Sequence, residues 1–68
     1  MSIRFGLKEL LIEKNISQKR LSELTGLRPN TISDICSNKV TGIKLSTVEI
    51  LCKSLNVEIQ DLIRMTRE

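Results

Sequence analysis

One short segment of the chain carries side chains that could hydrogen-bond to a nucleic acid. Arg28 and Asn30 can bind the edges of bases, and an Asn amide can make two bonds to adenine in the major groove of B-DNA. The hydroxyls of Thr31 and Ser33 can bind bases or phosphates, and the carboxylate of Asp34 can accept a bond from a cytosine amino group. This chemistry needs an element that presents short polar side chains together on one exposed face.

A helix over about residues 29–37 would present them in this way. Pro29 suits the first position of a helix, where its missing N–H costs nothing, and it favours an extended residue before it. Ile32, Ile35 and Cys36 recur at the spacing of one helical face, which predicts that they face the core. At about 100° per residue, the opposite face carries the polar residues Asn30, Ser33, Asp34 and Ser37.

The residues before this helix predict a second helix that reaches it through a tight turn. Ser17 is suited to be the N-cap, and Ile16 and Leu21 have the spacing of a hydrophobic staple. The helix is expected to end near Thr25, because Gly26 adopts the left-handed conformation without a Cβ penalty.

Three further helices complete the prediction, which is an all-α fold of five helices in a single domain over residues 1–68. The first runs over about 3–14 and the fourth follows a loop at 38–43. The inner face of the first consists of Ile3, Leu7, Leu10 and Leu11. The inner face of the fourth consists of Leu45, Val48, Leu51, Cys52 and Leu55, and a short fifth helix carries Ile59, Leu62 and Ile63. No segment alternates apolar and polar residues for long enough to predict a strand.

Composition excludes several classes of site. The 68 residues include no His, Trp or Tyr and one Phe, which removes histidine acid–base chemistry, histidine metal ligands and an aromatic stacking platform. Cys36 and Cys52 are too few for a zinc site, so we expect no metal or cofactor and two reduced core thiols, with a redox role for Cys36 as the minor alternative. We find no nucleophile beside a base and no Gly-rich phosphate loop, so we expect no enzyme. The N-terminus lacks an apolar signal region and the longest apolar run is Leu10–Ile12, so we expect no membrane span and a cytoplasmic location.

The net charge of +3 is concentrated around the proposed reading helix. Residues 17–44 contain five cations and two anions, whereas the rest of the chain contains six of each. Excess positive charge near polar, base-reading side chains supports a nucleic-acid partner.

The order of these features resembles the Cro/Xre-type helix-turn-helix regulators, which have the lambda-repressor-like fold. The resemblance covers almost the whole chain and is carried by Ser17-Gln18, Leu21-Ser22, Thr25-Gly26-Leu27, Asn30 to Ile35 and Asn38-Lys39, followed by Ile43 to Thr47, Leu51 to Lys53, Leu55-Asn56 and Asp61-Leu62. It implies a sequence-specific double-stranded DNA-binding regulator, most often a repressor, that inserts the helix at about 29–37 into the major groove.

The resemblance also implies a role for each matching position. Gln18 corresponds to a phosphate contact at the start of the second helix. Pro29, Asn30 and Asp34 fall where the family reads bases, with Arg28 just before them, although Pro29 also has an ordinary role as a helix starter. The remaining implied DNA contacts are Thr31 and Ser33, as neighbouring polar groups, and Lys39 and Lys44, as backbone clamps.

Three positions depart from the family pattern. Pro29 replaces a longer polar side chain and offers only apolar contact, for example to a thymine methyl group. Asp34 places an acid on the face that meets DNA. Asn38 stands where the family often has Gly, and Asn tolerates the left-handed conformation. The first two departures bear on the target sequence rather than on the mode of binding.

Several apolar residues fall outside the predicted core faces and suggest a homodimer. Phe5 and Ile12 lie on the far side of the first helix, and Ile50 lies on the outer side of the fourth. With them we group Ile59, Ile63 and Met65 as a candidate dimer surface. A two-fold protein would read a near-palindromic operator with half-sites about 34 Å apart.

A second interpretation also fits these residues. The acid at Asp34 and the off-core apolar residues also suit a protein-interaction module on the same scaffold, such as an antitoxin or an antagonist that binds another regulator. An antitoxin can also bind DNA, so the two readings overlap.

Overall fold

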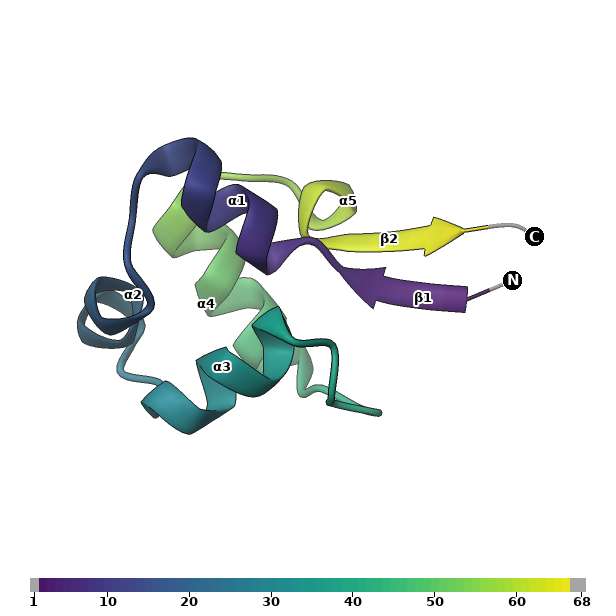
Figure 1. Cartoon of the computed structure of the whole chain (residues 1–68), viewed down its shortest axis with the longest axis horizontal. Helices are drawn as coiled ribbons and strands as arrows, with labels where there is room; N and C mark the ends of the chain where they lie inside the picture. Colours follow the sequence, from purple (N-terminus) through teal and green to yellow (C-terminus); the bar gives the residue numbers. More distant parts are fainter. Residues whose placement is uncertain (1, 67–68) are drawn as a thin grey trace.

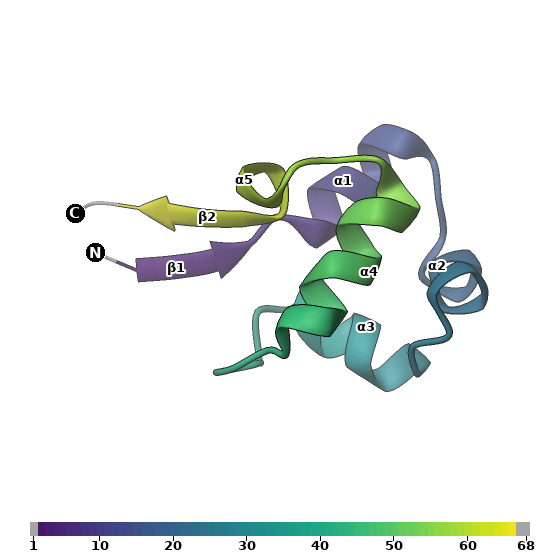
Figure 2. The same cartoon turned by 180° about the vertical axis from the view of Figure 1, so that it is seen from behind.

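The computed structural model describes residues 2–66, which form five helices and a two-stranded antiparallel sheet. The elements are β1 (Ser2–Phe5), α1 (Leu7–Lys14), α2 (Gln18–Thr25), α3 (Pro29–Cys36), α4 (Leu45–Leu55), α5 (Ile59–Leu62) and β2 (Ile63–Thr66). The helices gather into one body, and β1 and β2 extend from it as a ribbon at the end opposite α2 (Figure 1). The view from behind shows the same separation (Figure 2), and the molecule measures 36 × 21 × 19 Å.

Short capping signals fix the limits of the helices. The Ser17 hydroxyl accepts the Arg20 backbone N–H at 3.0 Å, as the sequence predicts for the N-cap of α2. Gly26 ends α2 with φ +77°, and Pro29 occupies the first turn of α3. Asn15 and Asn56 end α1 and α4 in the left-handed conformation, which Asn tolerates better than most residues.

The core lies where α1, α2, α3, α4 and α5 meet. Its most fully buried side chains are Leu7, Leu21, Ile32, Ile35, Leu51 and Leu62. Phe5, Leu10, Leu11, Cys36, Val48 and Leu55 complete the buried apolar cluster. The cluster draws on every helix and on one strand, so burial of apolar surface holds the short helices together more than helix propensity does.

The sheet corrects the prediction of an all-α fold. β1 and β2 pair in the register Ser2↔Thr66, Ile3↔Met65, Arg4↔Arg64 and Phe5↔Ile63. Each strand has only four residues, so its alternation is too short to stand out from a helical pattern. The pairing joins the two ends of the described chain, a contact that no local pattern reveals.

Four apolar positions differ from their predicted places. Ile3 and Ile63 belong to strands rather than to the first and fifth helices, because α1 begins only at Leu7 and α5 ends at Leu62. Leu45 is the first residue of α4 and is 83% exposed, so the expectation that it faces the core is wrong. Phe5 was expected off the core, but it is 9% exposed and packs within the cluster.

Among residues 2–66, no helix has the length and apolar character needed to cross a bilayer.

Candidate nucleic-acid interface

Side-chain hydrogen bonds fix the turn between α2 and α3. The Ser22 hydroxyl donates to the Leu27 carbonyl at 2.5 Å, and the Thr25 hydroxyl donates to the Leu21 carbonyl at 2.8 Å while accepting the Leu27 N–H at 3.1 Å. The Gly26 N–H donates to the Ser22 carbonyl at 2.8 Å. These bonds satisfy the polar groups of a half-buried turn and set the angle at which α3 leaves α2. We call residues 17–36, from the N-cap of α2 to the end of α3, the α2–α3 unit.

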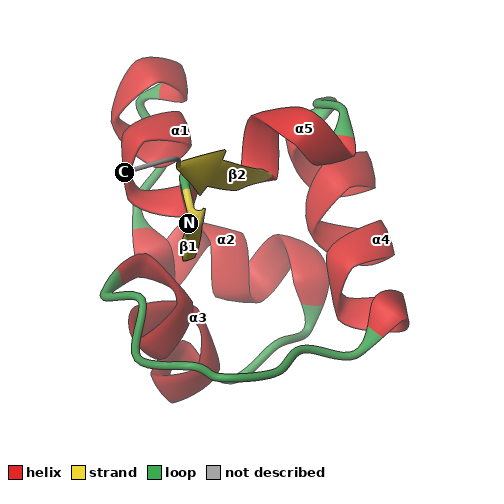
Figure 3. Cartoon of the chain, turned by 90° about the vertical axis from the view of Figure 1, so that its right-hand side faces the viewer, coloured by secondary structure: helices red, strands yellow, loops and turns green. Residues whose placement is uncertain are grey.

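The polar face of α3 points to solvent. Its outward residues are Asn30, Ser33, Asp34 and Ser37, and all four are exposed. Ile32 and Ile35 are buried on the opposite face with Cys36, which confirms the predicted orientation of this helix. Thr31, which was also predicted to contact DNA, is half-buried and so less exposed than these four residues. Seen from the side of the ribbon, α3 lies on the surface of the molecule (Figure 3).

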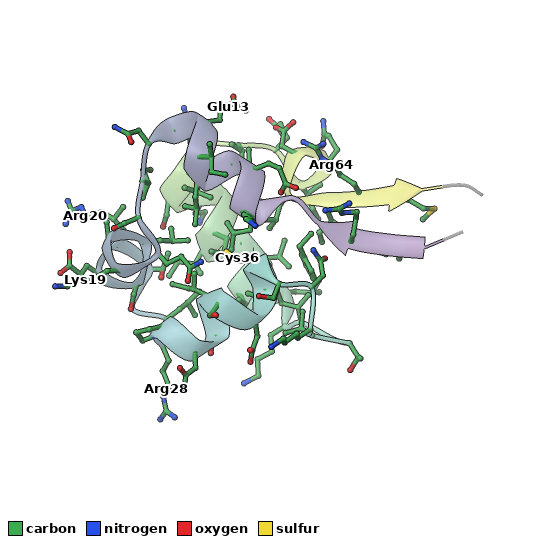
Figure 4. The ribbon with its side chains drawn as sticks, viewed as in Figure 1. Glu13, Lys19, Arg20, Arg28, Cys36 and Arg64 are labelled. Atoms are coloured by element: carbon green, nitrogen blue, oxygen red, sulfur yellow. The ribbon has the colours of Figure 1, made fainter. Side chains whose placement is uncertain are left out.

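The first turn of α3 leaves backbone donors without partners from a cap. Arg28 is the N-cap residue and provides no side-chain bond to the first turn. Figure 4 shows the Arg28 side chain extending away from the body of the molecule. Free N–H groups at a helix N-terminus and a nearby guanidinium both favour an anionic partner such as phosphate.

The cations around α3 are not neutralised within the described part of the chain. Arg28, Lys39 and Lys44 make no ion pair with any residue in the range 2–66, whereas Arg4 pairs with Glu9, Arg20 with Glu23 and Lys53 with Glu49. The three pairs are exposed, with N–O distances of 3.4 to 3.6 Å. Positive charge therefore remains available on both sides of the polar face.

Two surface hollows show which predicted contacts lie near each other. Lys44 and Thr31 line one hollow beside Leu27 and Gly42, so the predicted clamp lies next to α3 although it is distant in sequence. Gln18 lines a second hollow with Lys8 and Arg20, between α1 and α2. Lys8 was not predicted as a site residue, because its nearness to Gln18 arises only from the packing of α1 on α2.

Asn38 has a structural role beyond the predicted left-handed turn. Its backbone has φ +58°, and its side-chain oxygen accepts the Phe5 N–H at 2.5 Å while its amide nitrogen donates to the Phe5 carbonyl at 3.3 Å. The Asn38 amide therefore binds the outer edge of β1 as a neighbouring strand would. Through this residue, the end of α3 is fastened to the β1–β2 ribbon.

The two cysteines are structural thiols. Both are free, Cys36 is buried and Cys52 is half-buried. Burial raises the pKa of the Cys36 thiol above its ordinary 9.0, and the charge of Glu9 adds to the rise while Lys8 opposes it. Burial, followed by Glu58 and Asp61, also raises the pKa of Cys52. A raised pKa disfavours the reactive thiolate, which argues against a redox role for Cys36.

Comparison with known families bears on this geometry. The model of the Cro/C1-type HTH DNA-binding domain matches residues 6–68. The chain belongs to this family. The matched range contains all five helices and β2 but leaves out β1. Membership in a DNA-binding family fits an exposed polar α3 with unpaired cations at its ends.

Individual relatives of this Cro/C1-type domain agree with the assignment. The uncharacterized HTH-type transcriptional regulator YozG of Bacillus subtilis (strain 168) is 30% identical over 63 residues, which cover 93% of this chain and 75% of YozG. A solved structure of a candidate DNA-binding protein from Bacteroides fragilis superposes with a TM-score of 0.82 at 33% identity, covering 93% of this chain and all of that one. The transcriptional regulator VanUg shares the fold, with a TM-score of 0.76 at 22% identity over 97% of this chain and 87% of its own.

Proposed function

We propose that this Cro/C1-type domain is a sequence-specific transcriptional regulator, acting as a repressor, that inserts α3 into the major groove of double-stranded DNA. The observation that carries the proposal is the exposed polar face of α3, bordered by the unpaired cations Arg28, Lys39 and Lys44. The B-DNA major groove is about 12 Å wide, which admits a helix of this kind. The same proposal places the protein in the cytoplasm, with its DNA.

The residues divide into base-reading and phosphate-binding groups. Arg28 and Asn30 read bases at the N-terminal end of α3, Pro29 contacts a thymine methyl group, and Asp34 accepts a bond from cytosine. Thr31 and Ser33 provide further polar contacts in the groove. Gln18, Lys39 and Lys44 bind phosphates on either side and set the register of α3 on the duplex.

Selection of bound duplexes from a random pool, followed by affinity measurements in a salt series, tests this function. Affinity is expected to fall steeply with salt, because each phosphate contact releases about one counterion. Lys39→Ala and Lys44→Ala should weaken binding on all duplexes and each reduce the slope by about one. Lys53→Ala is the matched control, since Lys53 is paired with Glu49 on α4 and should leave both quantities unchanged.

Variants at the proposed base-reading residues should change sequence preference, whereas variants at the phosphate-binding residues should weaken binding to all duplexes. Asn30→Ala and Arg28→Ala should each relax the preference at one base position by about 1–3 kcal/mol, with little change on unrelated DNA. Asp34→Asn should change which base is preferred at its position. A flat salt response together with no enriched sequence would contradict the proposed function.

We also propose that the protein acts as a homodimer on a near-palindromic operator. Two copies of α3 must then lie about 34 Å apart to enter successive major grooves on one side of the duplex. Selected sequences should contain two inverted half-sites with this spacing. Enrichment of one unrepeated half-site would contradict the dimer while leaving DNA reading by α3 intact.

A protein-interaction role is the second candidate, favoured by Asp34. Its carboxylate is exposed on the polar face of α3 and has no ion pair within residues 2–66. An acid in this position opposes phosphate and would suit a basic protein surface, as in an antitoxin. Capture of a stoichiometric protein partner that is lost in Asp34→Lys, with no enriched duplex, would favour this candidate over DNA reading.

A further inference from the structure

The β1–β2 ribbon (residues 2–5 and 63–66) has an apolar face that the rest of the chain only partly covers. Because successive strand residues point to opposite faces, Ile3 and Phe5 share one face with Ile63 and Met65. Phe5 and Ile63 pack on the core, but Ile3 and Met65, which face each other at the outer end, are 64% and 62% exposed. Two strands alone are only marginally stable in water, so this outer end lacks the neighbours that a sheet needs.

The outer edge of β1 also offers backbone groups for pairing. The N–H and C=O of Phe5 point away from β2, because both bind the Asn38 side chain. In an antiparallel pair the direction of these groups alternates along the strand, so those of Arg4 face β2 and those of Ile3 face outward beside Phe5. Within residues 2–66, no hydrogen bond engages the outward N–H and C=O of Ile3.

We propose that a second copy of this chain pairs antiparallel with the outer edge of β1, about a two-fold axis at Ile3. The product is a four-stranded sheet in which the two β1 strands are central and the two β2 strands lie outside. This inference rests on the homodimer proposed above and assigns its surface. It keeps Met65 from the dimer surface predicted by the sequence, adds Ile3, which the sequence assigned to the core, and leaves Ile12, on the last turn of α1, outside the interface.

A two-fold axis at Ile3 gives hydrogen-bond partners to the outward N–H and C=O of Ile3. The outward groups of Phe5 need none, because they already bind Asn38. Ile3 and the partner's Ile3 would form a hydrogen-bonded pair, in which two residues exchange both of their bonds. The side chains would form a continuous apolar row across four strands, from Met65 through the two central isoleucines to the partner's Met65. The register also sets Arg4 opposite the partner's Ser2, so the pairing brings no two arginines into direct opposition.

The position of α3 favours β1 over β2 as the paired edge. Asn38 fastens the end of α3 to the outer edge of β1, so this edge lies on the side of the proposed reading helix. β2 lies on the side of α5 (Figure 1). Pairing through β1 therefore brings the two α3 helices near the two-fold axis.

The reach of the ribbon agrees with the spacing of DNA half-sites. From the middle of α3 to Asn38 is about 8 Å at the rise of a helix. The bridge to Phe5 adds about 5 Å, the spacing of neighbouring strands, and the step to Ile3 adds about 7 Å. The axis lies about 2.5 Å beyond Ile3, midway between the two strands, so the middle of α3 lies within about 23 Å of it. Two copies then lie at most about 45 Å apart, a range that includes the 34 Å of one DNA turn.

Disulfide trapping tests which edge is paired. In Ile3→Cys the two thiols would sit on Cα atoms about 5.5 Å apart, within the range of a disulfide. In Met65→Cys, which changes the residue opposite Ile3, they would be three strand spacings apart, about 14 Å. Oxidation should therefore give a covalent dimer of Ile3→Cys and not of Met65→Cys or of the native chain, whose Cys36 is buried and Cys52 half-buried. Trapping of Met65→Cys alone would overturn the assignment to β1.

Sedimentation of the uncrosslinked protein provides the second measurement. The native chain should associate as a dimer at micromolar concentration. Ile3→Pro removes the outward N–H from an edge strand, where proline is tolerated, and should raise the dimer dissociation constant at least tenfold. Ile12→Thr removes an apolar side chain that is at least as exposed as Ile3 and should leave the dissociation constant unchanged.

The experiments distinguish failure of the proposed interface from failure of the proposed DNA-binding function. A monomeric Ile3→Pro that still binds one half-site shows that α3 reads DNA without the ribbon contact. If no duplex binds but Ile3→Cys is trapped, the interface stands and the DNA function fails. A native chain that sediments as a monomer both alone and on a two-half-site duplex, with no trapping of Ile3→Cys, would overturn the interface.

Discussion

The α2–α3 unit and the β1–β2 ribbon are held in place by different kinds of interaction. In the α2–α3 unit, the cap at Ser17 and the turn bonds of Ser22 and Thr25 join residues at most five positions apart. In the ribbon, residues 2–5 pair with residues 63–66, and the bonds of Asn38 to Phe5 span 33 positions. The first region is therefore specified locally, and the second exists only once the helical body has formed.

The largest expected effect on the unfolding free energy tests how far the helical body depends on the α2–α3 unit. Ile32→Ala empties a fully buried position on α3 and should cost about 3 kcal/mol of unfolding free energy, a large share of the stability of so small a chain. Ile3→Ala, at an exposed position of the ribbon, should cost less than about 0.5 kcal/mol where the protein is monomeric. Urea unfolding followed by circular dichroism measures both. Equal losses would mean that the ribbon supports the monomer as much as the core does.

The next effect concerns the bridge between the two regions. Asn38→Gly keeps the left-handed backbone but removes both bonds to Phe5, and should cost about 2 kcal/mol, or about 1 kcal/mol for each bond. Hydrogen exchange of the Phe5 amide should become faster at the same time. Asn38→Asp is the control that retains an acceptor for the Phe5 N–H, and its amide should stay better protected. Unchanged protection in Asn38→Gly would mean that pairing with β2 alone holds β1.

The difference between the two regions also explains how much of the fold could be predicted from the sequence. The order of five helices, the N-cap at Ser17, the stop at Gly26 and the outward face of α3 all follow from short spacings, and the structure confirms them. The strands do not follow, because Ile3 and Ile63 fit an apolar helical spacing as well as a short strand. Only their pairing across the chain decides between the two.

The candidate site was predictable to the same degree. The exposure of Asn30, Ser33 and Asp34 follows from the helical period and from the apolar residues Ile32 and Ile35 behind them. The nearness of Lys8 to Gln18, and of Lys44 to Thr31, depends on how separate helices and loops pack, which spacing within one helix does not encode. The same holds for the amide of Asn38, whose partner Phe5 lies 33 positions earlier in the sequence.

A smaller effect isolates the turn of the α2–α3 unit. Gly26→Ala should cost about 1 kcal/mol, because φ +77° is unfavourable for any residue with a Cβ. No atom lies within 4 Å of the Cβ that would be added, so the cost comes from the backbone conformation and not from a clash. Gly42→Ala also meets no atom within 4 Å and is the control with little expected change. Thermal unfolding measures the difference, and similar melting temperatures for the two variants would contradict this account of the turn.

The smallest effect is the dependence of stability on alkaline pH through Cys36. Because burial raises the pKa of this thiol above 9.0, the unfolded chain loses its proton at a lower pH than the folded chain does. The unfolding free energy should therefore decrease as pH rises past about 9, and the thiol should contribute no pH dependence below that range. Cys36→Ala should show a shallower decrease in urea titrations from pH 8 to 10. Parallel curves for the two proteins would mean that the thiol ionises equally in both states.

The pairing of Ser2 with Thr66 has a topological consequence. Because these two positions lie side by side, a short glycine linker could join the first and last strands of residues 2–66 into a covalently closed backbone. New ends opened between Thr41 and Gly42, two exposed residues of a loop, would give a circular permutant in which β1 and β2 become a continuous hairpin. In that permutant the strand contact would become local in sequence and would form early rather than late in folding.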